Sequence, residues 1–126
     1  MYLRFIVVAP RARPAFGLFR SEYHPRYDES LPEWLRPPIE ELYDWFGANL
    51  AVPRRFTVVS RRRRIYAGLC WFRPEAREHI ARARELALLI AEAGQPTAML
   101  KTRRPGQVLY RDEFQIVAKP EAHGRA

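Results

Sequence analysis

Residues 74–102 read PEAREHIARARELALLIAEAGQPTAMLKT, and this stretch decides the fold. The proline and glutamate at its start suit the first turn of a helix, and apolar residues recur behind them at helical spacing. That apolar stripe consists of Ile80, Ala83, Ala87 and Ile90, widened by Leu86 and Leu89. Gly94 and then Pro96 end the pattern, so we predict a helix that reaches about Ala93. Residues 97–102 follow as a strand.

Upstream of this helix, the sequence predicts three strands and another helix. Residues 2–8 are rich in β-branched and aromatic side chains and predict a first strand. A helix is predicted from 38 to about 53, with apolar positions at Ile39, Leu42, Tyr43, Phe46 and Leu50. Residues 56–60 and 65–72 flank Arg61–Arg64, which predicts a hairpin with a four-arginine tip. Because both faces of the 65–72 run are apolar, we expect it to be a central strand.

Downstream, Arg104-Pro105-Gly106 supplies the residues of a type II turn, so we predict a second hairpin there, between 97–102 and 107–110. Residues 114–118 add a further strand. The order of elements predicts an α+β fold with an antiparallel or mixed sheet and two helices on one face. We interpret it as a modified ferredoxin-like split βαβ plus an extra C-terminal strand.

The chain of 126 residues, 48% hydrophobic and 29% charged, has the size and composition of one globular domain. We assign that domain to residues 1–119, with a long irregular excursion at 10–37 and a flexible tail at 120–126. Cys70 is the single cysteine, which excludes an internal disulfide and a thiolate metal site. The sequence has neither a leader peptide nor an apolar run of membrane-spanning length, so we expect a cytoplasmic protein with no membrane partner.

Positive charge is concentrated in two windows that contain no acid. The formal net charge is +8. Seven arginines lie between Asp44 and Glu75, and four positively charged residues lie between Glu92 and Asp112. The rest of the chain is net negative. Both windows contain a predicted hairpin, and the arginines fall at or beside its turn.

Arginines crowded together repel one another, and a phosphate backbone neutralises them with release of counterions. Our first hypothesis is therefore a non-enzymatic protein that binds nucleic acid or another polyanion. The predicted contact residues are Arg54, Arg55, Arg61, Arg62, Arg63, Arg64, Lys101, Arg103 and Arg104. Two alternatives stay open: solvated loops that keep the protein soluble, and an adaptor or inhibitor that grips an acidic protein.

The excursion at 10–37 mixes aromatic residues with charges that nearly balance. Tyrosine, tryptophan and arginine are typical of protein interfaces. The interface candidates are Phe16, Phe19, Tyr23, Tyr27 and Trp34. The segment fits a protein interface, the lid of a small enzyme, or apolar material packed over the sheet, and the sequence does not decide among these interpretations.

No catalytic constellation is present in the sequence, so we predict no catalytic residue, metal or cofactor. His24, His79 and His123 lack metal-ligand spacing, and we expect His79 to face solvent. Cys70 is either a nucleophile or a buried, inert thiol, and we favour the second. Asp112-Glu113 would supply a carboxylate pair for acid–base chemistry, but fits better as the solvated face of a bulged strand.

Residues 64–71 resemble the third strand of the RNA recognition motif, in which a basic residue precedes exposed aromatics. The matching residue types are Arg64, Tyr66, Ala67, Leu69 and Trp71. Ile65 stands where that motif has glycine, and Gly68 replaces its central aromatic. Alternation within a buried strand explains the same pattern, and we favour that explanation.

The C-terminal part of the chain carries a second resemblance. GLCWF at 68–72 through GQVLYRDEFQIVA at 106–118 looks like a group of small uncharacterised bacterial proteins. The resemblance implies a single intact domain and no particular chemistry.

Overall fold

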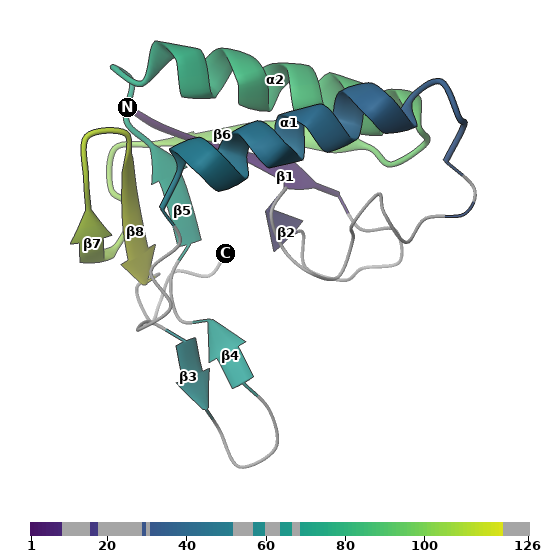
Figure 1. Cartoon of the computed structure of the whole chain (residues 1–126). Coiled ribbons are helices and arrows are strands. Elements are labelled where there is room, and N and C mark those ends of the chain that lie inside the picture. The colour runs from purple at the N-terminus through teal and green to yellow at the C-terminus, as the bar shows by residue number, and fades with distance from the viewer. Residues whose placement is uncertain are drawn as a thin grey trace.

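The computed structural model describes residues 1–8, 16–17, 29, 31–51, 57–59, 64–66 and 69–119. In this part of the chain, two helices and eight strands are formed (Figure 1). In chain order they are β1 (Tyr2–Val7), β2 (Phe16–Gly17), α1 (Arg36–Asn49), β3 (Thr57–Val59), β4 (Arg64–Tyr66), β5 (Leu69–Phe72), α2 (Arg77–Glu92), β6 (Thr97–Thr102), β7 (Gln107–Arg111) and β8 (Gln115–Lys119). Neither helix has the length and apolar character needed to cross a bilayer.

The main sheet is antiparallel throughout. Its strands pair in the order β6–β1–β5–β8–β7, and β2 also pairs with β1. Since β5 and β6 both run antiparallel to β1, which lies between them, β5, α2 and β6 form a split β–α–β unit. The two helices lie side by side over one face of the sheet (Figure 1). The predicted α+β class, antiparallel sheet and placement of the helices are confirmed.

The strand order departs from the ferredoxin-like plan at one position. The run β6–β1–β5 is consistent with that plan, but the place beside β5 is taken by β8 from the C-terminal part of the chain. β3, which would occupy this place in the plan, pairs with β4 in a separate two-stranded sheet. β8 suits the inner position because four of its five residues are buried.

β1 and β5 meet at a single residue pair in the described sheet, Leu3 with Phe72. By contrast, β6 pairs with all six residues of β1, and β8 pairs with all four residues of β5. β2 lies along the remainder of β1, opposite Ile6 and Val7. The sheet therefore consists of two half-sheets joined at Leu3 and Phe72, and β5 and β8 run crosswise to β1 and β6 in Figure 1.

The first predicted hairpin is confirmed, since Val59 of β3 pairs with Arg64 of β4. Its connecting residues, 60–63, lie outside the described part of the chain. The prediction of one strand over 65–72 is wrong, because the run is divided between β4 and β5 in two different sheets. Residues 67–68, between β4 and β5, lie outside the described part of the chain. β5 itself has neighbours on both sides, as expected for a central strand.

The prediction of a second hairpin between 97–102 and 107–110 is wrong. β6 and β7 lie at opposite edges of the main sheet, because the split β–α–β unit places β6 beside β1. The hairpin in this region is β7–β8, with its turn at 112–114. Lys101, Arg103 and Arg104 therefore belong to the end of β6 and the connection between the two edges, rather than to a hairpin tip.

α2 confirms the helix predicted from the opening stretch. Its buried side includes the expected residues Ile80, Ala83, Leu86, Ala87 and Ile90. The helix ends in a Schellman motif, with Gln95 N donating to Ile90 O at 3.1 Å and Gly94 N donating to Ala91 O at 2.9 Å. Gly94 has a φ of 103°, in the left-handed region that glycine adopts without a steric penalty.

α1 begins at Arg36, slightly before the predicted start. A turn in which Leu35 N donates to Pro32 O at 3.0 Å leads into it. Leu31 and Leu35 are both buried in the core that α1 and α2 share with β1 and β5. The end of the 10–37 excursion is therefore core, and β2 is a strand that the sequence pattern did not indicate.

Both faces of the sheet are buried along its inner strands. Phe5, Val7 and Phe72 belong to the core under the helices. Trp71 and Ile116, which pair across β5 and β8, alternate with core residues and are also buried. This double burial explains why the sequence of β5 is apolar at every position.

Candidate anion-binding surface

The register of the sheet brings several strand ends together at one end of the molecule. Lys101, Leu3, Phe72 and Gln115 form one row across β6, β1, β5 and β8. With strands about 4.8 Å apart, this row spans about 14 Å. Immediately beyond it, the chain leaves β5 at Arg73 and enters β8 from the β7–β8 turn.

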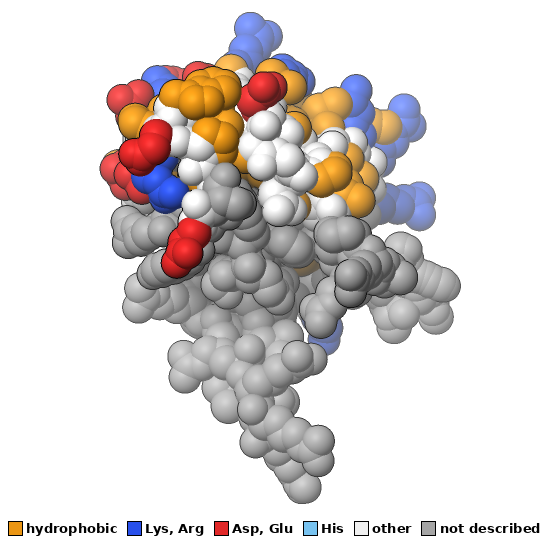
Figure 2. Space-filling view, turned by 90° about the vertical axis from the view of Figure 1, so that its right-hand side faces the viewer, with side chains coloured by type: hydrophobic (Ala, Val, Ile, Leu, Met, Phe, Trp, Pro, Cys, Tyr) orange, Lys and Arg blue, Asp and Glu red, His pale blue; other side chains and the backbone are white. Residues whose placement is uncertain are grey.

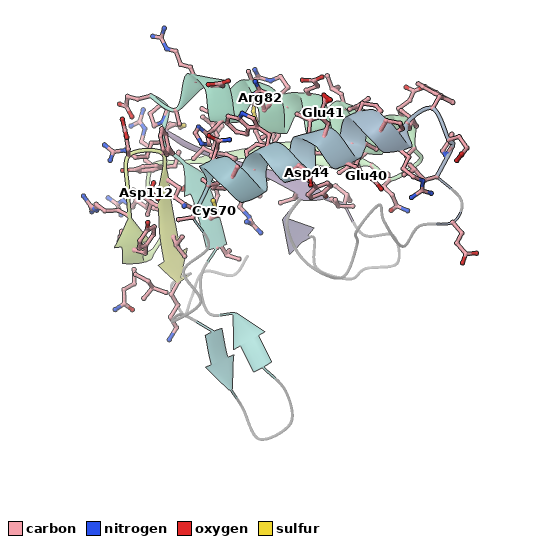
Figure 3. All side chains as sticks on the ribbon, in the orientation of Figure 1. Glu40, Glu41, Asp44, Cys70, Arg82 and Asp112 are labelled. Atoms are coloured by element: carbon pink, nitrogen blue, oxygen red, sulfur yellow. The ribbon has the colours of Figure 1, made fainter. Side chains whose placement is uncertain are left out.

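Six basic residues lie at these strand ends and the adjoining start of α2. We call them the basic end: Arg73, Arg77, Lys101, Arg103, Arg104 and Arg111. Nitrogen-tipped side chains gather here, on the left in Figure 3. Four carboxylate side chains, those of Glu75, Glu78, Asp112 and Glu113, lie in the same segments, so the charge of this end is still net positive.

The connection between β6 and β7 is shaped by Thr102. Its Oγ1 accepts a hydrogen bond from Arg104 N at 3.1 Å and donates one to Arg104 O at 3.2 Å. Gly106 has a φ of 112°, a conformation that favours glycine. Lys101, Arg103 and Arg104 are exposed, and none of them forms an ion pair with a carboxylate of the described residues.

Arg73 is attached to the β7–β8 turn. Its backbone N donates to Phe114 O at 2.9 Å, and its Nη1 donates to the carbonyl of Asp112 at 3.2 Å. Its Nε lies 3.9 Å from Glu75 Oε1, a long ion pair in which 37% of the Arg73 side chain stays exposed. The guanidinium is therefore held in position while keeping access to solvent.

The carboxylate of Asp112 is occupied within the turn. Its Oδ1 accepts from the backbone N of Phe114 at 2.8 Å and of Gln115 at 3.0 Å, while its Oδ2 accepts from Tyr110 OH at 2.9 Å and Gln115 Nε2 at 3.1 Å. Burial raises the pKa of this carboxyl, but the hydrogen bonds together outweigh it and leave the pKa below its ordinary value of 3.8. Asp112 is thus a structural turn residue, and Glu113 beside it is exposed.

Gln115 extends this network into the core. Its side chain is almost completely buried, and its Nε2 also donates to Ala51 O at 2.7 Å. Its Oε1 accepts from the thiol of Cys70 at 3.1 Å (Figure 3 labels Cys70 and Asp112). Burial of the thiol raises the pKa of Cys70 to about 12. The positive charge of Arg4 acts to lower this pKa, and the negative charge of Asp112 acts to raise it further. The thiol is protonated at neutral pH, in agreement with the inert cysteine favoured from the sequence.

His79 is buried, so the prediction that it faces solvent is wrong. Its ring stacks on Phe114 at a centroid distance of 4.2 Å and makes an edge contact with Trp45 at 4.8 Å. Its Nε2 lies 2.8 Å from the carbonyl of Asn49, the last residue of α1. The pocket offers both aromatic contact and a hydrogen bond, which compensates the burial of a polar ring.

Most of the predicted contact residues lie outside the described part of the chain. These are Arg54, Arg55, Arg61, Arg62 and Arg63, together with the interface candidates Phe19, Tyr23 and Tyr27. The structure gives Arg64 and Phe16 a place in β4 and β2. Trp34 precedes α1 and is 67% exposed.

The predicted residues that the structure does bring together are Lys101, Arg103 and Arg104. Arg73, Arg77 and Arg111 join them, and no prediction assigned these three to the site. Arg73 and Arg111 lie in the two windows without acidic residues, and this is the sequence feature that could have identified them as site residues. Their meeting depends on the register between distant strands, which no local pattern encodes.

The stretch that resembles the RNA recognition motif is not one strand. Arg64 and Tyr66 lie in β4, whereas Leu69 and Trp71 lie in β5 of the other sheet. Trp71 is 9% exposed, so its ring is not a free stacking surface.

The described residues contain no group of three or more side chains able to hold a metal ion. No family model matches the sequence, and no curated protein or solved structure is similar to it.

Proposed function

We propose that this protein binds nucleic acid through the basic end and is not an enzyme. The observation that carries the proposal is the exposure of Lys101, Arg103 and Arg104 within four residues of the chain, at the end of β6 and just after it, without an ion pair among the described residues. Exposed cations keep their hydration, so an extended polyanion that lies across them gains from counterion release without a large desolvation cost. Arg73, held beside them by the turn, adds a fourth contact.

The acidic residues elsewhere in the molecule also support the proposal of nucleic-acid binding at the basic end. α1 carries the acidic residues Glu40, Glu41 and Asp44, labelled in Figure 3. In Figure 2, most acidic side chains of the visible described surface lie on one flank, and the basic end lies on the far side of this view. The acidic residues repel a polyanion from that flank, which favours its approach to the basic end.

Fluorescence anisotropy with labelled single-stranded RNA, duplex DNA and heparin, each measured in a salt series from about 50 to 200 mM, tests the proposal. We expect binding to RNA or DNA that weakens steeply with salt. Arg103→Gln and Arg104→Gln together should reduce the slope of log K against log salt by about 1.4 to 1.8.

Arg82→Gln is the control, because it removes a charge that Glu78 already neutralises through hydrogen bonds of 3.0 and 3.1 Å. It should leave the slope close to that of the unchanged protein. Absence of binding at the lowest salt, or an unchanged slope in the double variant, would overturn the proposal. Tighter binding to heparin than to either nucleic acid would assign the surface to another polyanion. Recovery of one stoichiometric protein after nuclease treatment, with no nucleic-acid affinity, would instead assign it to an acidic protein.

A further inference from the structure

β6 is an edge strand whose outer side is exposed. All six of its residues pair with β1, and no other strand of the described chain pairs with it. Met99 and Leu100, at its centre, are 38% and 40% exposed. An exposed edge with apolar residues is a template for pairing with another strand, and proteins that remain monomeric protect such edges with charge or cover.

The outer side of α2 continues this exposed surface. Leu88 is 66% exposed, and Arg84 and Ala91 lie one turn before it and nearly one turn after it. Arg84 Nη2 lies 3.8 Å from Met99 Sδ, so the helix stripe and the strand edge are in contact. Together, Arg84, Leu88, Ala91 and Met99 form a continuous surface on the helix side of the sheet, and Leu100 lies on the opposite side of the same edge; we call these five residues the β6 edge surface.

The charges on α2 run against the helix dipole. Its first half contains Arg77, Arg82 and Arg84 against Glu78, whereas its second half contains Glu85 and Glu92, with no basic residue in the last turn. A helix by itself favours acids at its start and bases at its end. The arrangement therefore lowers the stability of the isolated helix, and it leaves the first half of α2 net positive and the second half net negative.

We propose that the β6 edge surface binds a second copy of this chain, with the two β6 strands antiparallel about a two-fold axis. The surface is complementary to itself in this orientation, because the basic half of each α2 lies level with the acidic half of the partner's α2. Arg84 lies near the axis, since it contacts Met99 at the centre of β6, and Arg77 of one copy lies level with the last turn of the partner helix, where Glu92 and the free carbonyl groups carry negative charge.

The spacing of the layers agrees with this arrangement. α2 contacts both β1 and β6, and a helix about 10 Å wide covers about two strands. When two sheets join at their β6 edges, the two α2 helices become neighbours on the same face, with Leu88 on their facing sides. The strand pairing covers residues 97–102, so it includes Lys101 but leaves Arg103 and Arg104 outside the interface.

Sedimentation velocity or light scattering across about 1 to 100 µM protein measures the association. The unchanged protein should be a dimer at the upper end of this range. Leu88→Glu and Met99→Lys should each shift the dissociation constant upward at least tenfold. Val108→Glu is the matched control, since Val108 is also 40% exposed but lies on the opposite edge strand, β7. It should leave the dimer intact.

A charge exchange tests the orientation. Arg77→Glu should weaken the dimer, and combining it with Glu92→Arg should restore it, because the two positions face each other across the axis. A protein that is monomeric throughout the concentration range overturns the proposal, as does dissociation by Val108→Glu but not by Leu88→Glu. Failure of the double variant to recover overturns the antiparallel arrangement. Circular dichroism of each variant confirms that it is folded.

Discussion

The imidazole of His79 stacks on the ring of Phe114, with centroids 4.2 Å apart and planes inclined by 25°. His79 lies in the first turn of α2, and Phe114 lies in the β7–β8 turn. Since His79 Nε2 also lies 2.8 Å from Asn49 O, this one side chain joins α2, the end of α1 and the turn that carries Asp112. His79 therefore holds the β7–β8 turn, next to the basic end, against the two helices.

Replacing His79 with alanine should lower the free energy of unfolding by about 2 to 4 kcal/mol, because it leaves a cavity among aromatic rings. His79→Phe keeps the aromatic contact and loses the hydrogen bond to Asn49 O, so it should cost about 1 kcal/mol. Urea denaturation followed by tryptophan fluorescence measures both. Equal losses in the two variants would show that packing contributes nothing.

Replacement by alanine should lower the free energy of unfolding at Gly94 and raise it at Gly47. Gly94 has a φ of 103°, so Gly94→Ala forces an unfavourable backbone conformation and should destabilise by about 1 kcal/mol. Gly47 lies within α1, and a Cβ added there meets nothing within 4 Å, so Gly47→Ala should stabilise by about 0.5 to 1 kcal/mol. Thermal unfolding of the two variants checks the sign of each change.

Asp112 should contribute stability that disappears in acid. Its pKa in the folded protein is held below the ordinary value of 3.8 by hydrogen bonds, so the folded state binds a proton less readily than the unfolded state. The stabilisation is complete above the ordinary pKa of 3.8 and is lost as the pH falls from there through the lower pKa of the folded protein. The difference in unfolding free energy between the unchanged protein and Asp112→Asn should therefore shrink below about pH 4.

Glu113→Gln is the control for that measurement, because it removes the neighbouring exposed carboxylate and should follow the unchanged protein at every pH. A constant difference between Asp112→Asn and the unchanged protein down to about pH 3 would contradict the role given to the ionised carboxylate.

Cys70 should resist thiol reagents while the protein is folded. Its pKa of about 12 leaves little thiolate at pH 8, and its Sγ is engaged with Gln115 Oε1. We expect the rate of reaction with a disulfide reagent to rise at least a hundredfold in denaturing urea, measured by absorbance of the released thiol. Rapid reaction under native conditions would indicate a reactive site instead.

The elements set by local pattern were predictable from the sequence. The stripe from Ile80 to Ile90 and the stop at Gly94 identify α2, because helical periodicity and a left-handed cap are both properties of a short segment. β1 and the β3–β4 hairpin follow from β-rich runs in the same way.

Which strands pair was not predictable, because it depends on segments far apart in the chain. β8 takes the place beside β5 that the ferredoxin-like plan gives to β3, and nothing local to either strand distinguishes the two outcomes. The same holds for the basic end, where Arg73 and Arg103 meet through the register of β5, β1 and β6. His79 was mistaken for a surface residue because its aromatic pocket is assembled from α1, β5 and the β7–β8 turn.

The single pair of Leu3 and Phe72 connects two half-sheets that are each continuous, and residues 103–106 connect their far edges. Arg73 belongs to one half-sheet and Lys101 to the other. The separation of these two positive charges is therefore set by the geometry at one residue pair and by the shared core that packs both half-sheets against α1 and α2.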